Sequence, residues 1–162
     1  MDNTQHSDGN KKRRKSTHKL GDVVSLGEKS GFINHQVTSV RVANMLGGKV
    51  AQQIPNHVFV IVGLKIDNQS DELFRIRSSA YVIRDAAGGT YEPDTWADIF
   101  LEADDRIELK SISFNHVDSG ASKEGALIFD VPPENTIGLL IKSSDFTNSS
   151  KSRLIQLGTI ET

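Results

Sequence analysis

Cysteine is absent from this chain of 162 residues, and aromatic residues are scarce at 6%. The missing cysteine excludes a disulfide scaffold, a thiolate metal site and a cysteine nucleophile. The longest apolar run, from Val58 to Leu64, is far shorter than the ~20 residues that a membrane-spanning helix needs. The chain also lacks a large net charge, because it has 19 basic and 21 acidic residues. We therefore expect one soluble domain with a tail.

The charge that is present is distributed unevenly. Residues 1–20 have a net charge of +4, whereas the remaining chain carries −6. No apolar residue lies between Met1 and Leu20, so this segment cannot bury enough surface to offset its ordering entropy, and we expect a disordered basic leader. A solvated spacer and a contact with an anionic surface are both consistent with such a leader. Its basic run consists of Lys11, Lys12, Arg13, Arg14 and Lys15.

Residues 21–162 predict an all-β domain. Short apolar alternations are separated by turn residues, and no long stretch repeats with the period of a helix. The strongest strand, 58–66, has apolar residues on both faces of its first half, so we expect it to be central and covered on both sides. Further strands are expected at 23–26, 32–42, 73–76, 79–84, 107–116, 126–131, 137–141 and 154–157. About seven or eight strands with regular turns are typical of an antiparallel β-sandwich.

The expected core follows the period-2 positions of these strands. It consists of Val58, Val60, Val62, Leu64, Tyr81, Ile83, Leu127, Phe129, Val131, Leu139 and Ile141. Two segments are less regular. Residues 44–53, with Gly47 and Gly48, read as a loop or hairpin, and residues 96–101 predict one helical turn or an edge segment, with Thr95 or Asp94 as the cap.

Several short motifs occur in a familiar order. Gly21-Asp22 opens the first strand, Phe59–Val62 leads through an apolar strand to Asp67-Asn68, Asp85–Tyr91 forms a D-x-x-G-x-x-Y-like hairpin, and Gly125–Pro132 reads as G-x-hydrophobic-x-F-x-V-P. Together they resemble the domain-of-unknown-function 4352 family from Gly21 to Ile160. The resemblance implies an immunoglobulin-like sandwich, similar to that of secreted immunoprotective antigens, in proteins that are mostly exported or lipid-anchored and prokaryotic. It implies no catalytic residue.

Candidate functional residues gather around the single tryptophan. Trp96 is either a core or loop anchor or an exposed partner contact, and Asp94 and Asp98 lie beside it. The acidic stretch Glu92–Asp105 has enough carboxylates for a calcium site but lacks the usual spacing, so a solvated loop is the favoured interpretation. The five histidines have no metal-ligand spacing, and no nucleophile or nucleotide motif is present.

These observations favour a non-enzymatic binding or interaction module with no cofactor. We expect an unknown protein partner and a location outside the cell or in its envelope, with any signal or anchor segment lying upstream of Met1. The leader would then be a tether at the membrane surface. The alternative is a cytoplasmic protein that binds nucleic acid or an anionic surface through Lys11–Lys15. The acidic charge of residues 21–162 argues against nucleic-acid binding by the domain itself.

Overall fold

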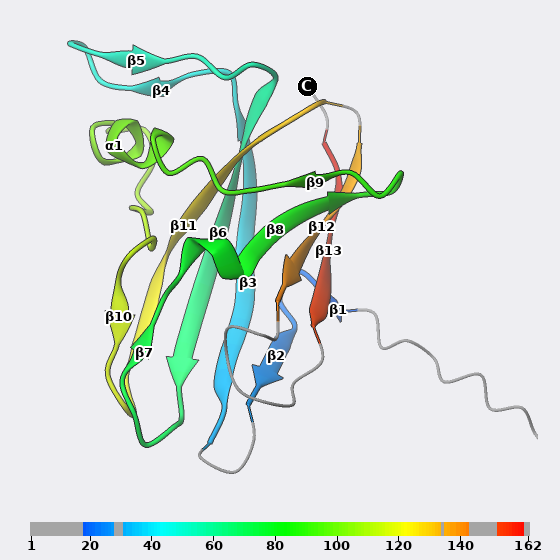
Figure 1. Ribbon diagram of the computed structural model, residues 1–162. Coiled ribbons are helices and arrows are strands. Elements are labelled where there is room, and N and C mark those ends of the chain that lie inside the picture. Colours follow the sequence, from blue (N-terminus) through cyan, green and yellow to red (C-terminus); the bar gives the residue numbers. More distant parts are fainter. Residues whose placement is uncertain (1–17, 28–30, 134, 143–151, 161–162) are drawn as a thin grey trace, which may run out of the picture.

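The computed structural model describes residues 18–27, 31–133, 135–142 and 152–160, so the basic run Lys11–Lys15 lies outside the described residues. Two sheets pack face to face (Figure 1). The first is antiparallel and has the order β11 (Ser122–Val131), β6 (Val58–Asn68), β3 (Ile33–Ala43) and β2 (Val23–Leu26). The second has the order β1 (His18–Lys19), β13 (Arg153–Thr159), β12 (Thr136–Ile141), β8 (Tyr81–Asp85) and β9 (Thr90–Tyr91).

Smaller elements complete the described part of the chain. β7 (Phe74–Arg75) pairs with β10 (His116–Val117), and β4 (Leu46–Gly47) pairs with β5 (Gln52–Gln53). A 3-10 turn, η1 (Ser78–Ala80), precedes β8, and α1 (Ala97–Glu102) is the single α-helix of the described residues. The predicted all-β sandwich is confirmed. Seven of the thirteen described strands are four residues or longer, and all seven lie in the two main sheets.

The main core lies between the two sheets. All eleven predicted core residues are buried in it, with exposed fractions of 4% or less. β6 is central as predicted, between β11 and β3, and its residues from Val58 to Leu64 are buried on both faces. Alternate residues therefore serve two different cores: Val60 and Val62 face the other sheet, whereas Phe59 and Ile61 face outward. Phe59 and Ile61 are therefore buried by a second layer of the chain outside the sandwich.

The expected strand at 107–116 is wrong. Only His116–Val117, which extends one residue past it, forms a strand there, and the rest of the segment is irregular apart from one bridge between Ser111 and Ala126. The reason is that Ile107 belongs to the outer cluster and Ile112 to the main core. The chain crosses the edge of β11 between them, which a straight strand cannot do. Phe114, at a φ of 62°, lies in the sharp turn that follows.

A buried hydrogen bond links the two sheets. His35 of β3 is fully buried, and its Nε2 lies 2.7 Å from the hydroxyl oxygen of Tyr81 on β8. With the ring proton on Nδ1, which faces the Ile33 carbonyl at 3.3 Å, Nε2 accepts the tyrosine proton. The ring of Phe74 packs edge-on at 6.2 Å. Burial lowers the pKa of His35 to about 4, so the imidazole is neutral at physiological pH.

We expect the free energy of unfolding to fall as the pH drops from 6.5 to 4. Above pH 6.5 the histidine is neutral in both states and the stability is complete. Between 6.5 and 4 the unfolded chain takes up a proton that folded His35 does not, because the pKa is lowered from 6.5 to about 4. The loss is about 3 kcal/mol, measurable by urea denaturation across this range.

The control separates His35 from other acid effects. His35→Gln keeps polar atoms near Tyr81 but cannot titrate, so its stability should change much less over this range. His57→Gln replaces a histidine that is half exposed, and it should keep the full slope. An unchanged slope in His35→Gln would show that another group causes the acid sensitivity.

Candidate partner-binding surface

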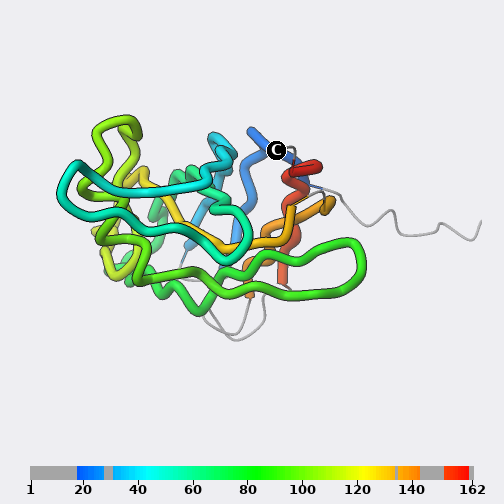
Figure 2. The backbone as a smooth tube through the Cα atoms, turned by 90° about the horizontal axis from the view of Figure 1, so that it is seen from above, coloured from blue at the N-terminus to red at the C-terminus, as the bar shows by residue number. Residues whose placement is uncertain are grey.

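The outward face of β6 and β11 is covered by a second, smaller hydrophobic cluster. The outer cluster consists of Leu46, Phe59, Ile61, Ala97, Leu101, Ile107, Ala126 and Ile128. Its cover comes from α1, from the β4–β5 hairpin and from the segment that follows α1 (Figure 1). We call α1 and this hairpin the tip; the two lie side by side in Figure 1 and again in the view from above in Figure 2.

Both ends of α1 are satisfied by side chains. The N-cap position of α1 is Trp96, which has no side-chain cap, so the expected cap at Thr95 or Asp94 is wrong by one or two residues; the Asp94 carboxylate still accepts a hydrogen bond from the Ala97 N–H at 3.1 Å. At the other end, the Lys110 ammonium donates to the carbonyls of Leu101, Asp104 and Ile107 at 3.1–3.2 Å. A cation is favourable there because the helix dipole is negative at its carboxyl end. A six-residue helix is thus held by one anion and one cation.

The hairpin is fastened to α1 through a buried carboxylate. Asp104 is fully buried and binds Arg106 in a bidentate pair, with Nη2–Oδ2 at 2.7 Å and Nε–Oδ1 at 2.9 Å. Its Oδ2 also accepts the N–H of Gly47 at 3.2 Å, and Arg106 donates to the Met45 carbonyl at 3.2 Å. A side chain on Gly48 would meet the Ala103 carbonyl at 3.0 Å, so the hairpin approaches α1 closely. The Arg106 guanidinium holds the pKa of Asp104 well below its usual range.

The outer surface of the tip is apolar. Trp96 and Ile99 of the helical segment are 66% and 59% exposed, and Val50 in the hairpin turn is fully exposed. Ile54, just after β5, is 76% exposed. Single exposed apolar residues are ordinary on protein surfaces, but several on adjacent elements are typical of an interaction site.

A groove of about 390 Å³ lies between the hairpin and α1. We call it the tip groove; its lining is Gly48, Lys49, Val50, Ala51, Ile99, Phe100 and Ala103. Lys49 is the one charged residue in this lining. Residues 44–53 form the hairpin expected from the sequence, but the groove beside it was not predicted.

The structure brings the predicted contact residues to the tip. The side chain of Trp96 is 66% exposed, so it is not a core residue, and its role as a partner contact stays a prediction. Asp94 and Asp98 are half-buried beside it. Burial raises the pKa of Asp98, the nearby Ser113 and Ser111 hydroxyls act in the opposite direction, and the charges of Asp94 and Glu102 raise it further.

The described histidines lie apart from one another. Within the described ranges, no group of three or more histidine and acidic side chains is placed to hold a metal ion. His57 lies beside Asp130 and His116 beside Asp118, while His35 is in the core. The same ranges contain no helix that is long and apolar enough to cross a membrane.

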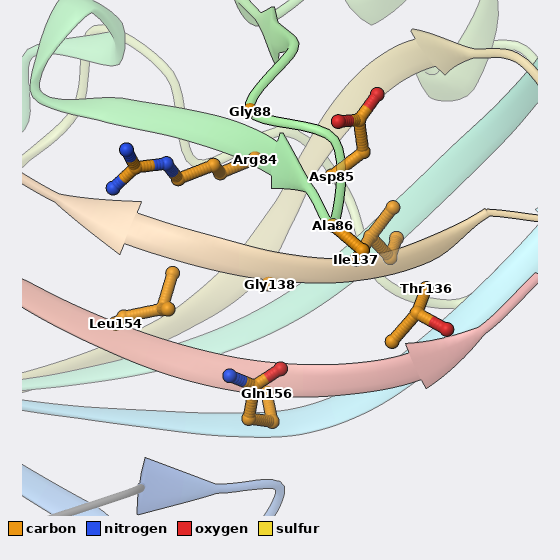
Figure 3. A pocket seen from close by; sticks show the side chains of 9 residues that line it. All are labelled: Arg84, Asp85, Ala86, Gly88, Thr136, Ile137, Gly138, Leu154 and Gln156. Atoms are coloured by element: carbon orange, nitrogen blue, oxygen red, sulfur yellow. The ribbon is translucent and has the colours of Figure 1, made fainter. Parts of the chain in front are cut away.

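A second depression lies on the outer face of the five-stranded sheet (Figure 3). Its charged residues are Arg84 and Asp85, which point away from each other. The Asp85 carboxylate is occupied by its own turn, where it accepts hydrogen bonds from the N–H groups of Ala87 and Gly89 and from the Tyr91 hydroxyl. The Gly89 N–H and the Tyr91 hydroxyl lower the pKa of Asp85. It stays ionised and offers no acid–base pair.

Comparison with known proteins identifies the family. A family model described as a domain of unknown function (DUF4352) matches residues 18–152. The chain belongs to this family. No curated protein sequence matches the chain at a significant level.

Solved structures share the fold of this DUF4352 domain. The yjhA protein of Bacillus subtilis superposes with a TM-score of 0.60 at 16% identity, covering 87% of this chain and 99% of the other. The secreted protein MPT63 of Mycobacterium tuberculosis gives 0.59 at 15% identity, covering 88% and 95%. A candidate lipoprotein of B. subtilis, ycdA, gives 0.51 at 14% identity, covering 82% of this chain but 39% of the other.

The motifs that carried the resemblance to DUF4352 have structural roles. Asp85 and Tyr91 close the β8–β9 hairpin through their side-chain hydrogen bond of 2.9 Å, with Gly88 at a φ of 89° between them. Gly125 lies where the chain crosses the edge of β11. A Cβ there would come within 2.8 Å of both the Lys110 carbonyl and the Ile112 side chain. These positions specify the fold and not a site.

We expect Asp104→Ala to loosen the hairpin. The variant leaves the Gly47 N–H without its acceptor and Arg106 without its partner, which costs about 1–3 kcal/mol. Amide exchange at Gly47 and the urea midpoint would both report the change. Asp105→Ala is the matched control, because this neighbouring carboxylate is exposed and forms no ion pair among the described residues. Equal exchange rates in the two variants would contradict the fastening role.

We expect Trp96→Ala to leave the fold almost unchanged. A side chain that is 66% exposed contributes little burial, so the change in unfolding free energy should stay within about 0.5 kcal/mol, or a Tm shift of about 2 °C. Leu101→Ala, which opens a hole in the outer cluster, should cost about 2–5 kcal/mol. Thermal melting followed by circular dichroism compares them. Similar losses in both variants would restore the anchor interpretation.

Proposed function

We propose that this domain is a non-enzymatic binding module that works outside the cytoplasm and contacts a protein partner through its tip. The observation that carries the proposal is the exposed apolar surface of Trp96, Ile99 and Val50 beside the tip groove. Tryptophan is enriched among the few residues that dominate the binding energy of protein interfaces, and neighbouring apolar contacts exclude water from it. Hydrogen bonds hold this surface in place: Asp104 accepts the N–H of Gly47 in the hairpin, and Lys110 donates to the carbonyl of Leu101 in α1.

The titratable groups with strongly shifted pKa values support a binding role over catalysis. His35 is sealed in the core, Asp104 is bound by Arg106, and Asp85 is held by its turn. Burial lowers the pKa of His35, and hydrogen bonds to Arg106 and to the β8–β9 turn lower the pKa values of Asp104 and Asp85. Catalysis would need a nucleophile, a base and an open position between them, and the two grooves described here are lined by no such set.

The proposed compartment draws support from proteins of similar fold. MPT63 is a secreted protein and ycdA is a candidate lipoprotein. A domain held at the envelope needs a tether, and the basic leader around Lys11–Lys15 has the composition for one. In this arrangement the tip is free to meet a partner.

The test is a photo-crosslink placed at position 96 in the cells that make the protein. With benzoylphenylalanine replacing Trp96, we expect a single dominant protein adduct in the envelope or secreted fraction. The same probe at Val23 is the matched control. Val23 is 58% exposed and lies on β2, the edge strand of the four-stranded sheet opposite β11. We expect no adduct of the same mass from Val23.

Two results would overturn the proposal. One is the absence of any adduct that is specific to position 96. The other is recovery of the protein in the cytoplasm with nucleic acid bound in a salt-sensitive manner, since this is the behaviour expected of a binder that acts through Lys11–Lys15.

A further inference from the structure

A row of four register partners crosses β8, β12, β13 and β1 of the five-stranded sheet. The row consists of Arg84, Gly138, Gln156 and Lys19. Because paired residues on adjacent strands point to the same side, these positions share one face of the sheet. The neighbouring row, which includes Ile83 and Leu139, faces the main core, so the row of four faces outward. Arg84, Gln156 and Lys19 are exposed, and the two cations therefore face solvent.

The strands of this sheet contain no carboxylate that neutralises these cations. Asp85 is the one acidic residue among the five strands as the structure describes them, and its carboxylate is held by the β8–β9 turn. The Asp22 carboxylate accepts the backbone N–H of Lys19 at 2.9 Å. Neither Arg84 nor Lys19 forms an ion pair within the described part of the chain. This face is locally positive although residues 21–162 carry a net charge of −6.

The depression of about 360 Å³ shown in Figure 3 lies in the same face. Arg84 lies on one side of it, Leu154 and Gln156 lie on the other, and Gly138 lies between them. A guanidinium group recognises phosphate through parallel N–H donors, and an amide adds a further donor. The depression therefore offers donors of the kind that a phosphate group requires.

The basic leader joins this sheet at its edge. The run Lys11–Lys15 ends three residues before His18, where β1 begins, and β1 is the edge strand beside β13. The run lies outside the described residues, but three residues of chain span at most about 11 Å. An anionic surface that binds the run would therefore be close to Lys19 and to the outward face of this sheet.

The acidic stretch of the domain lies on the other side of the sandwich. Residues 92–108 contain seven carboxylates, and this stretch passes beside β11 and then over the outward face of β6 and β11. Asp104 is neutralised by Arg106, whereas the other six form no ion pair in the ranges that the structure describes. These six are Glu92, Asp94, Asp98, Glu102, Asp105 and Glu108. Packed sheets lie about 10 Å apart, which is about one Debye length in physiological salt, so their effect on the cationic face is screened.

We propose that the outward face of the five-stranded sheet docks on an anionic lipid surface, with Arg84 and Lys19 against headgroup phosphates. This inference rests on the proposed function and adds the orientation of the domain at the envelope. The tip covers the other sheet, on the opposite side of the sandwich, and so points away from the lipid (Figure 1). One face then holds the domain at the membrane while the other meets the partner.

The spacing of the cations favours a lipid surface over other anionic occupants. Arg84 and Lys19 are three strand spacings apart, or about 14 Å, so a single phosphate cannot contact both. A lipid surface presents a separate phosphate to each cation and also meets the basic run beside β1. A second copy of this chain would bring like charges together on this face.

The test is co-sedimentation of the full chain with vesicles that contain equal amounts of phosphatidylglycerol and phosphatidylcholine. We expect binding that weakens as salt is raised, and about tenfold weaker binding to vesicles of phosphatidylcholine alone. The double variant Arg84→Gln with Lys19→Gln should weaken binding about 25-fold, or about fivefold for each cation removed.

The matched control removes the same charge from the other sheet. Arg41→Gln with Lys65→Gln replaces one arginine and one lysine on β3 and β6, at positions that face outward with Ile61. This control should bind the vesicles as the unchanged chain does. Neutralising the run by replacing Lys11–Lys15 with glutamine should weaken binding further when it is combined with the Arg84 and Lys19 changes.

Trp96 reports the orientation on the vesicle, because it is the only tryptophan of the chain. It lies at the tip and is 66% exposed, so contact between the tip and the lipid would be detected directly. With brominated phosphatidylcholine in the vesicles, we expect bound protein to show almost no quenching of its tryptophan emission.

Four results would overturn the inference. They are no binding to the phosphatidylglycerol vesicles, equal binding by the Arg84–Lys19 variant and its control, strong quenching of Trp96 by the brominated lipid, and binding to DNA or polyglutamate in place of vesicles. Equal binding by the two variants would show that the leader acts alone. If any of these occurs while the position-96 crosslink persists, the binding function stands and only the docking face fails. Loss of the crosslink with variant-sensitive vesicle binding intact would overturn the partner contact at the tip and leave the docking face.

Discussion

The two-sided burial of β6 is the constraint on which the rest of this structure depends. A strand with apolar side chains on both of its faces is unstable in a sandwich of only two layers, because its outer face would be exposed to water. Val60 and Val62 are covered by the opposite sheet, but Phe59 and Ile61 need a third layer. The chain builds that layer from short pieces: a six-residue helix, a two-residue-strand hairpin and an irregular crossing segment. The tip exists because β6 must be covered.

Such a thin layer cannot hold itself together by burial alone, so polar groups fasten it. Isolated helices of six residues and isolated two-stranded hairpins are both unstable in water. The Asp104 carboxylate joins the hairpin to the segment after α1, and the Lys110 ammonium donates to the carbonyls of Leu101, Asp104 and Ile107. These contacts give the tip a defined shape with little hydrophobic area, which is why its outward apolar residues remain available.

The sequence predicted the sandwich well and the tip poorly, for a physical reason. Period-2 alternation in β6, β11 and β12 reports burial directly, so the core residues from Val58 to Ile141 were predictable from local pattern. Residues 107–116 also alternate, but their apolar positions serve two different clusters, and only the path of the chain around β11 distinguishes them. The exposure of Trp96 and the groove beside it depend on how the hairpin meets α1, a long-range contact without a local signature. The roles of Asp104 and Lys110 were invisible for the same reason.

The two halves of the molecule also differ in what their polar groups can do. In the sandwich, the two fully buried polar side chains of β3 and β6 have hydrogen-bond partners: His35 bonds Tyr81, and Asn68 bonds the carbonyls of Glu72 and Val117. At the tip the balance is left open, with six carboxylates that have no ion pair among the described residues and aliphatic side chains in water. Both features reduce the solubility or stability of an isolated domain, and neither is needed to cover Phe59 and Ile61.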